Sequence, residues 1–215
     1  MNKKIQIVPA ILAQNGTDFK KRWLKIAPYF KYAQIDIMDG ALVKTKNNIR
    51  PSYVKDLSKK HALEIHLMVK NVSRRIWPWL KLKNIRKIIW HYEANQNKQV
   101  IIDLGQYLKK KNIRSGLAIN PPTSLEKIKN LIKYFDTIQI MGVNPGWEKQ
   151  NFQTSVLKKI RSLRKSYPAI NIAVDGGVNE KNASAIKKAG ANILGVGSYL
   201  QEAKNIRGAI KKLQK

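Results

Sequence analysis

The chain has 215 residues, of which 43% are hydrophobic, and a formal net charge of +29. This length suffices for one well-buried core and falls in the lower part of the size range of a (β/α)8 barrel. There is no cysteine, which excludes a disulfide framework, thiolate catalysis and a thiolate metal site. Residues 1–16 hold only a short apolar stretch, interrupted by Gln6 and Pro9, unlike a signal peptide or a membrane span. We therefore expect a soluble protein of the cytoplasm with no membrane segment.

The positive charge arises from 42 Lys and Arg residues against 13 Asp and Glu residues. Such a field attracts polyanions at low ionic strength, so non-specific nucleic-acid binding is one interpretation. However, the lysines are spread along the chain and fall mostly where helices should expose polar faces. We interpret the charge as a solvated basic surface that would also steer a phosphorylated metabolite toward a site.

Apolar runs bounded by turn signals predict eight buried strands. In chain order they are expected at residues 6–12, 33–38, 63–68, 87–91, 114–119, 137–141, 171–174 and 193–196. Helical spacing lies between them at residues 18–27, 72–82, 100–111, 125–134, 155–166 and 182–189.

This alternation predicts a parallel sheet covered by helices, because a crossover between parallel strands normally contains a helix. Eight units leave roughly 27 residues each, close to the size of a βαβ unit. The rival is a doubly wound open sheet, which gathers its ligands at one switch point. Candidate site residues here end strands from the second to the eighth, which favours a single closed (β/α)8 barrel over residues 1–215.

Two carboxylates end apolar runs: Asp36 in QIDIM and Asp175 in NIAVD. In a barrel both would project at the C-terminal mouth, where active sites are built. Two carboxylates around one substrate carbon can remove a proton from one face and return one to the other. The alternative for Asp36 is a capping role, and for Asp175 a turn before two glycines.

His66 ends the third run, in EIHLMV. A lone histidine there is more often a satisfied core residue. Beside two carboxylates it would complete a three-ligand set for a divalent metal with open positions. Such a metal would stabilise negative charge on a substrate oxygen after proton loss.

Glycines follow the last two strands, in DGGV at 175–178 and GVGS at 195–198, each before an expected helix start. Their backbone N–H groups lie where this architecture usually binds phosphate. A glycine pair alone usually marks a turn. NPGW at 144–147 also reads as a tight turn, or functionally as a loop that closes over the substrate.

These residues resemble the ribulose-phosphate 3-epimerase family, whose members are (β/α)8 enzymes of the pentose phosphate and Calvin pathways. The matching segments occur in family order from end to end: VPAIL (8–12), IDIMDG (35–40), HLMV (66–69), HYEA (91–94), LAINPPT (117–123), MGVNPGW (141–147), VDGGV (174–178) and GVGS (195–198). The resemblance implies the ribulose-phosphate-binding type of TIM barrel.

Carried over by position, the resemblance implies that Asp36 and Asp175 are the acid/base pair. It also implies that both bind one divalent metal ion (zinc, iron or manganese) with His66. The remaining substrate-binding set comprises a sulfur-lined floor and a phosphate end: Met38, Met68, Met141, Gly146, Gly176, Gly177, Gly197 and Ser198. Barrel relatives that decarboxylate a sugar acid phosphate carry Lys at the position of Met38, which disfavours that chemistry here.

Three departures from the family pattern involve four positions. Gln34 stands where the family has a histidine as fourth metal ligand, and an amide oxygen binds transition metals more weakly than imidazole. Ala10 replaces a serine that contacts substrate. Glu148 and Lys149 replace glycines, so that backbone donors to the phosphate are lost and Lys149 would substitute by charge.

We expect a metal-dependent epimerase acting on a ketopentose 5-phosphate, ribulose 5-phosphate or xylulose 5-phosphate. One rival is an epimerase of a hexulose 6-phosphate of the allulose type. The other is a non-catalytic barrel that binds polyanions such as nucleic acid. The family's dimers and hexamers suggest a homo-oligomer, which the high charge would oppose.

Overall fold

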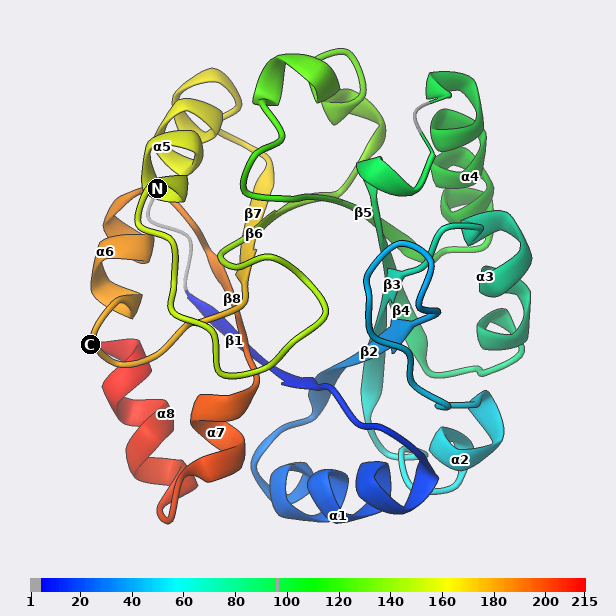
Figure 1. The fold of residues 1–215 in the computed structure, drawn as a ribbon, viewed down its shortest axis with the longest axis vertical. Coiled ribbons are helices and arrows are strands. Elements are labelled where there is room, and N and C mark those ends of the chain that lie inside the picture. Colours follow the sequence, from blue (N-terminus) through cyan, green and yellow to red (C-terminus); the bar gives the residue numbers. More distant parts are fainter. Residues whose placement is uncertain (1–4, 96) are drawn as a thin grey trace.

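The computed structural model describes residues 5–95 and 97–215. Within them, parallel strands form a closed barrel in the order β1-β2-β3-β4-β5-β6-β7-β8, ringed by helices (Figure 1). The strands are β1 (Gln6–Ile11), β2 (Tyr32–Met38), β3 (Ala62–Met68), β4 (Ile85–His91), β5 (Arg114–Ile119), β6 (Thr137–Met141), β7 (Asn171–Asp175) and β8 (Ile193–Val196). The predicted (β/α)8 TIM barrel is confirmed. The single-domain range stays a prediction, and its residues 1–4 and 96 lie outside the described residues.

The α-helices are α1 (Gly16–Ile26), α2 (Pro51–Lys55), α3 (Val72–Leu80), α4 (Lys98–Lys110), α5 (Val156–Ser166), α6 (Ala183–Lys188), α7 (Ser198–Glu202) and α8 (Ile206–Gln214). Short 3-10 helices are η1 (Ala27–Tyr29), η2 (Tyr92–Ala94), η3 (Leu125–Ile128) and η4 (Ile132–Tyr134). Among these helices, none combines the length and the apolar character that a membrane crossing requires, for residues 5–95 and 97–215.

The helix predicted over residues 125–134 is wrong, because the structure has η3 and η4 there. Leu131 N–H donates to Ile128 O at 2.8 Å, and Tyr134 N–H to Leu131 O at 2.9 Å. Both bonds span three residues, as in a 3-10 turn. The three-residue step places Ile128 and Leu131 on one face, and both are buried. Tight turns therefore bury the apolar residues that also fit a helical pattern.

The expectation that each late glycine pair precedes a helix start holds only for the second. Helix α7 begins at Ser198, directly after Gly197, whereas α6 begins at Ala183, several residues after the DGGV segment. The segment between Val178 and Ala183 is held by turns, in which Asn179 N–H donates to Asn182 Oδ1 at 2.9 Å.

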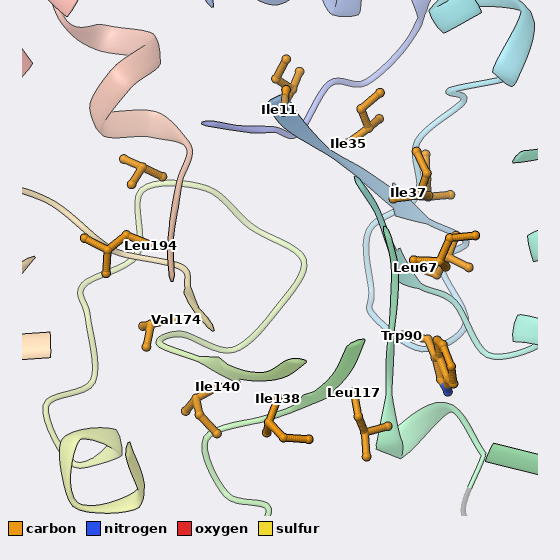
Figure 2. Close-up of a cluster of buried hydrophobic side chains, with 14 of the residues drawn as sticks. Ile11, Ile35, Ile37, Leu67, Trp90, Leu117, Ile138, Ile140, Val174 and Leu194 are labelled. Carbon is orange, nitrogen blue, oxygen red and sulfur yellow. The ribbon is translucent and has the colours of Figure 1, made fainter. Parts of the chain in front are cut away.

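Period-two alternation in the strands divides the molecule into two cores. Outward-facing residues such as Ile35, Leu67 and Leu117 pack between the strands and the helix ring (Figure 2). The alternate residues face the barrel interior, which is unusually polar. There Lys87 Nζ lies 2.7 Å from Glu64 Oε2, and the Tyr32 hydroxyl donates to the same oxygen at 2.9 Å. The charged groups Lys87 and Glu64 are therefore paired with each other inside the barrel, below its mouth.

Candidate active site

A pocket opens at the C-terminal mouth of the barrel, under the loop that follows β6 and crosses the opening in Figure 1. Most of the predicted site residues line it: Asp36, His66, Met68, Met141, Gly146, Lys149, Asp175, Gly176, Gly177, Gly197 and Ser198. Ala10, the replaced family serine, also lines it. Met38 does not belong to the described lining. It is buried against Val43 and Met68, and its sulfur lies 3.1 Å from the Thr45 hydroxyl.

The floor of the pocket joins Asp36 and His66, which lie two residues before the ends of β2 and β3, with Asp175, the last residue of β7. Parallel pairing sets Asp36 beside His66, so their side chains share the interior face. His66 Nδ1 lies 3.1 Å from Asp36 Oδ1 and 3.4 Å from Asp175 Oδ2. One ligand-type atom from each residue lies within 4.8 Å of the others, and all three residues are buried. Side chains from three separate strands therefore meet at one point, at or near the C-terminal ends of those strands, and the sequence predicts this convergence.

Gln34 lies one inward step deeper in β2 and faces the same three groups. Its Nε2 donates to Asp36 Oδ1 at 2.8 Å and to Asp175 Oδ2 at 2.6 Å, and lies 3.4 Å from His66 Nδ1. The sequence analysis expected its carbonyl oxygen toward this point. The amide nitrogen faces it instead, because carboxylate oxygens are satisfied by N–H donors and repel a carbonyl oxygen.

The pKa values of the three buried residues Asp36, His66 and Asp175 do not all shift in the same direction. Burial and the neighbouring Asp175 carboxylate raise the pKa of Asp36. Burial would also raise the pKa of Asp175, but hydrogen bonds from His66 and Gln34 lower it. Burial disfavours the charged form of His66, yet its contacts with Asp175 and Asp36 outweigh this and raise its pKa to about 9. Asp36 therefore holds a proton more strongly than Asp175 does.

Sequence reasoning assigned no role to two buried residues beside this group, Gln139 and His91. Gln139 Nε2 donates to Asp175 Oδ2 at 3.2 Å. His91 Nε2 lies 2.9 Å from His66 Nε2. The signal for Gln139 was its position two residues before Met141, on the inward face of β6. His91 ends β4 within the HYEA segment, which the sequence analysis matched without assigning it a function.

The phosphate end of the predicted site has a constrained backbone. Gly176 and Gly177 have φ of 98° and 71°, a region that favours glycine. A Cβ on Gly177 would lie 2.8 Å from the backbone nitrogen of Phe152. Only glycine fits this approach between the β7 end and the loop after β6. At Gly176 and Gly177, therefore, only backbone atoms line the pocket.

The loop over residues 144–150 is tied down at several points. The Thr45 hydroxyl donates to Gly146 O at 2.6 Å. Glu148 Oε1 accepts from Arg22 of α1 at 2.9 Å, and Lys149 Nζ lies 2.7 Å from Glu202 Oε1 of α7. The Lys149 ammonium is thus paired with Glu202, and its predicted role as a phosphate donor stays a prediction. The two residues that replace family glycines each fasten the loop to a different helix.

The donor set fits a divalent cation. Two carboxylates and one imidazole nitrogen supply ligand types found in catalytic metal sites with open positions. All three are buried at the end of one pocket. The Asp36–His66–Asp175 group could therefore bind a metal ion.

The fold is a (β/α)8 barrel, and two carboxyl groups and one histidine meet in the pocket at its mouth. Residues 6–201 match the model of the ribulose-phosphate 3 epimerase family. The ribulose-phosphate 3-epimerase of Helicobacter pylori (strain J99) is 30% identical over 98% of this chain and 97% of its own length. That of Schizosaccharomyces pombe is 30% identical, over 97% and 92%. The chain therefore belongs to the ribulose-phosphate 3-epimerase family, and it is an isomerase that acts on carbohydrates.

Solved structures confirm the fold alone. The 3-keto-L-gulonate-6-phosphate decarboxylase of Vibrio cholerae superposes with a TM-score of 0.73 at 14% identity, covering 99% of this chain and 97% of that one. The tryptophan synthase A-subunit of Pyrococcus furiosus gives 0.71 at 15% identity, covering 100% and 98%.

Proposed function

We propose that this chain interconverts ribulose 5-phosphate and xylulose 5-phosphate by proton transfer at C3. One observation carries the proposal. Two buried carboxyl groups, Asp36 and Asp175, lie at one point of the pocket with opposed pKa shifts. Pairs of titratable groups with opposed shifts are typical of an acid and a base serving one reaction.

The reaction needs both groups in turn. The ionised carboxylate removes the C3 proton, and the C–H electron pair enters an enediolate with the neighbouring carbonyl. The protonated carboxyl then delivers its proton to the opposite face of C3, which restores the ketone. Lowered pKa favours Asp175 as base for one direction, and the roles of Asp36 and Asp175 exchange in the reverse direction.

A divalent ion such as zinc, iron or manganese fits the same group. Asp36, His66 and Asp175 would hold it, with Gln34 as a weak fourth ligand after a rotation that turns its carbonyl oxygen inward. When bound, such an ion supplies charge stabilisation to substrate oxygens next to the reacting carbon.

The rest of the pocket would position the sugar. Met68 and Met141 line it with sulfur and carbon atoms, which are polarisable and cannot return a proton to the wrong face. Met38 would act one layer behind them. Backbone N–H groups at Gly177, Gly197 and Ser198, bordered by Gly146 and Gly176, would bind the phosphate.

An assay of the metal-depleted protein, reloaded separately with zinc, iron(II) and manganese, tests this proposal. Conversion of ribulose 5-phosphate to xylulose 5-phosphate should appear with at least one ion and fall by about 100-fold or more in Asp175→Asn. Asp103→Asn, which removes an exposed carboxylate on α4, is the matched control and should leave turnover unchanged. Absence of turnover with every ion would contradict the proposal.

A hexulose 6-phosphate is the second candidate substrate, because the pocket mouth differs from the family pattern. Trp147 is 61% exposed at the mouth, beside the charged Glu148 and Lys149. Allulose 6-phosphate belongs in the same assay. A higher kcat/KM for it than for ribulose 5-phosphate would replace the pentose assignment while leaving the proton-transfer chemistry in place.

A further inference from the structure

Helix α3 carries an exposed tryptophan on the outside of the helix ring. Trp77 is 47% exposed, whereas Trp79 of the same helix and Trp90 of β4 are buried. The Trp77 ring meets the ring of Tyr107 on the neighbouring helix α4, with centroids 5.1 Å apart and planes inclined by 76° (Figure 1). Packing against the core therefore does not account for this indole, which presents about half of its surface to solvent.

A hollow of about 370 Å³ lies beside the aromatic pair, and Tyr107 forms part of its wall. It lies at the amino ends of β4 and β5, because Ile85 is the first residue of β4 and Ile113 directly precedes β5. The catalytic pocket opens at the carboxyl ends of the strands, so the two sites lie at opposite ends of the barrel. The remaining lining combines apolar and basic side chains: Leu80, Leu82, Lys83, Arg86, Lys111 and Asn112.

The charge around the hollow is positive only. Within residues 5–95 and 97–215, no acidic side chain lines it, and Lys83, Arg86 and Lys111 form no ion pair. Lys111 Nζ lies 5.8 Å from the centroid of the Tyr107 ring, and Arg86 Nη1 donates to Lys83 O at 2.9 Å. The acidic residue of α4, Asp103, lies one turn before Tyr107 and outside the lining. Ammonium and guanidinium donors therefore remain for an anion beside exposed aromatic surface.

Charge complementarity selects the class of partner. In a two-fold dimer built on this surface, a second copy of the chain would set the same cations against each other. The partner must instead carry anionic groups for the cations and flat apolar groups for the indole. Single-stranded nucleic acid supplies both, because its phosphates bind Lys and Arg and its bases stack on aromatic rings.

We propose that the α3–α4 face, defined by Trp77, Tyr107, Lys83, Arg86 and Lys111, binds single-stranded nucleic acid without sequence preference. Trp77 stacks on a base, and the three cations bind the adjoining phosphates. The net charge of +29 attracts the strand to the whole molecule, and the aromatic pair determines where it is held. This role is separate from the proposed epimerase chemistry and does not rest on it.

Fluorescence anisotropy of a dye-labelled oligothymidylate of about 12 nucleotides measures the affinity of the full chain. Trp77→Ala should weaken binding by about 5- to 100-fold, as expected for the loss of one stacked base. Its salt dependence should stay unchanged, because no charge is removed. Trp77→Phe keeps an aromatic ring and should retain most of the affinity. Unchanged affinity in Trp77→Ala would overturn the proposal.

Trp147→Ala is the matched control, because it removes another exposed indole at the opposite end of the barrel. It should leave oligonucleotide affinity as in the unaltered protein. Equal losses in Trp77→Ala and Trp147→Ala would mean that no particular face holds the strand, and would overturn the proposal.

Tryptophan fluorescence tests the same contact with Trp77 intact. In Trp147→Phe, Trp77 is the one exposed indole, since the other tryptophans are at most 3% exposed: Trp23, Trp79 and Trp90. Oligothymidylate should quench the emission of this variant. Binding without quenching would place the strand elsewhere and overturn the proposal.

Heparin, a polyanion without bases, separates stacking from charge. Trp77→Ala should leave heparin affinity unchanged, and an equal loss for heparin and oligothymidylate would overturn base stacking. Replacing Lys83 and Lys111 together by Gln should lower the salt dependence of oligothymidylate binding by about one to two released ions. Replacing the exposed Lys158 and Lys165 of α5 by Gln is the charge-matched control and should lower it less. Equal reductions would contradict the assignment to the α3–α4 face.

Discussion

Gln34 occupies the position at which the resemblance implies a histidine as fourth metal ligand. Its amide nitrogen donates to both carboxylates and so holds Asp36 and Asp175 together. The same side chain can contribute to a metal site only through its oxygen, after a half-turn that breaks both bonds. If Gln34 acts as a metal ligand, its two short hydrogen bonds to the buried carboxylates must therefore break.

We predict that Gln34→His binds zinc at least about tenfold more tightly than the unaltered protein, because imidazole is the better ligand. A chelator-competition titration measures this. Gln34→Ala is the control, since it removes the amide without adding a ligand. Unchanged affinity in Gln34→His, or an equal gain in Gln34→Ala, would contradict the four-residue geometry.

His66 makes the stability of the metal-depleted protein depend on pH. Its pKa in the folded protein is raised to about 9 from its ordinary value of 6.5. Its stabilising charge is therefore fully present below pH 6.5 and is lost as the pH rises through 9. With a chelator present, the melting temperature should fall by several degrees over this window. His66→Gln should flatten the fall, and an equal fall in that variant would assign the effect to other groups.

At the residue scale, the sequence predicted those site residues that end apolar runs. Asp36, His66 and Asp175 each interrupt a buried strand with a polar group, which is a visible signal. Gln139, His91 and Glu93 form the next layer of polar groups around the site. Their local sequence does not indicate which residues they contact. Their contacts arise from barrel closure, which sets β4 and β6 around β3 and β7 at distances that no linear spacing encodes.

At the scale of elements, the loop over residues 144–150 carries two charged side chains, Glu148 and Lys149. Each of them forms an ion pair with a residue of a neighbouring helix. Arg22 lies between Asp18 and Glu148, with Nε 3.0 Å from Asp18 Oδ1 and Nη1 2.9 Å from Glu148 Oε1. The Arg22 and Glu148 side chains are 24% and 21% exposed, so solvent screens the pair only in part. This ion pair connects helix α1 to the loop over residues 144–150, which lies over the pocket.

We predict that Glu148→Gln raises KM by about two- to fivefold with little change in kcat, because a surface pair contributes about 0.2–1 kcal/mol. Steady-state kinetics over a range of substrate concentrations measures the change. Lys129→Gln removes an exposed ion pair with Glu126, remote from the pocket lining, and should have no effect. A KM unaltered by Glu148→Gln would mean that the other contacts of the loop, such as Thr45 with Gly146 O and Lys149 with Glu202, are sufficient to hold it.

The element boundaries show what period and apolarity can predict. Strand ranges were right to within about two residues, because alternation and burial act along the whole strand. The segment at 125–134 failed because its apolar spacing suits both an α-helix and successive 3-10 turns. Only the contact of Ile128 and Leu131 with the core distinguishes the two.

For the whole molecule, the net charge of +29 is the feature that the fold does not require. A positive field raises the encounter rate of an anionic substrate and is screened by salt. We predict that kcat/KM for the sugar phosphate falls steadily with ionic strength while kcat stays constant. Stopped-flow or initial-rate measurements across salt concentrations check this, and a flat kcat/KM would separate the charge from substrate capture. Oligomeric state, nucleic-acid binding and cytoplasmic location stay predictions.

The proposed function depends on proton transfer by Asp36 and Asp175 on opposite faces of one substrate carbon. Ribulose 5-phosphate incubated in D2O with the metal-loaded protein, and followed by proton NMR at C3, tests it most directly. We predict xylulose 5-phosphate carrying solvent deuterium at C3, with its formation reduced by about 100-fold or more in both Asp36→Asn and Asp175→Asn. Epimerised sugar without deuterium at C3, or undiminished formation in either variant, would contradict it.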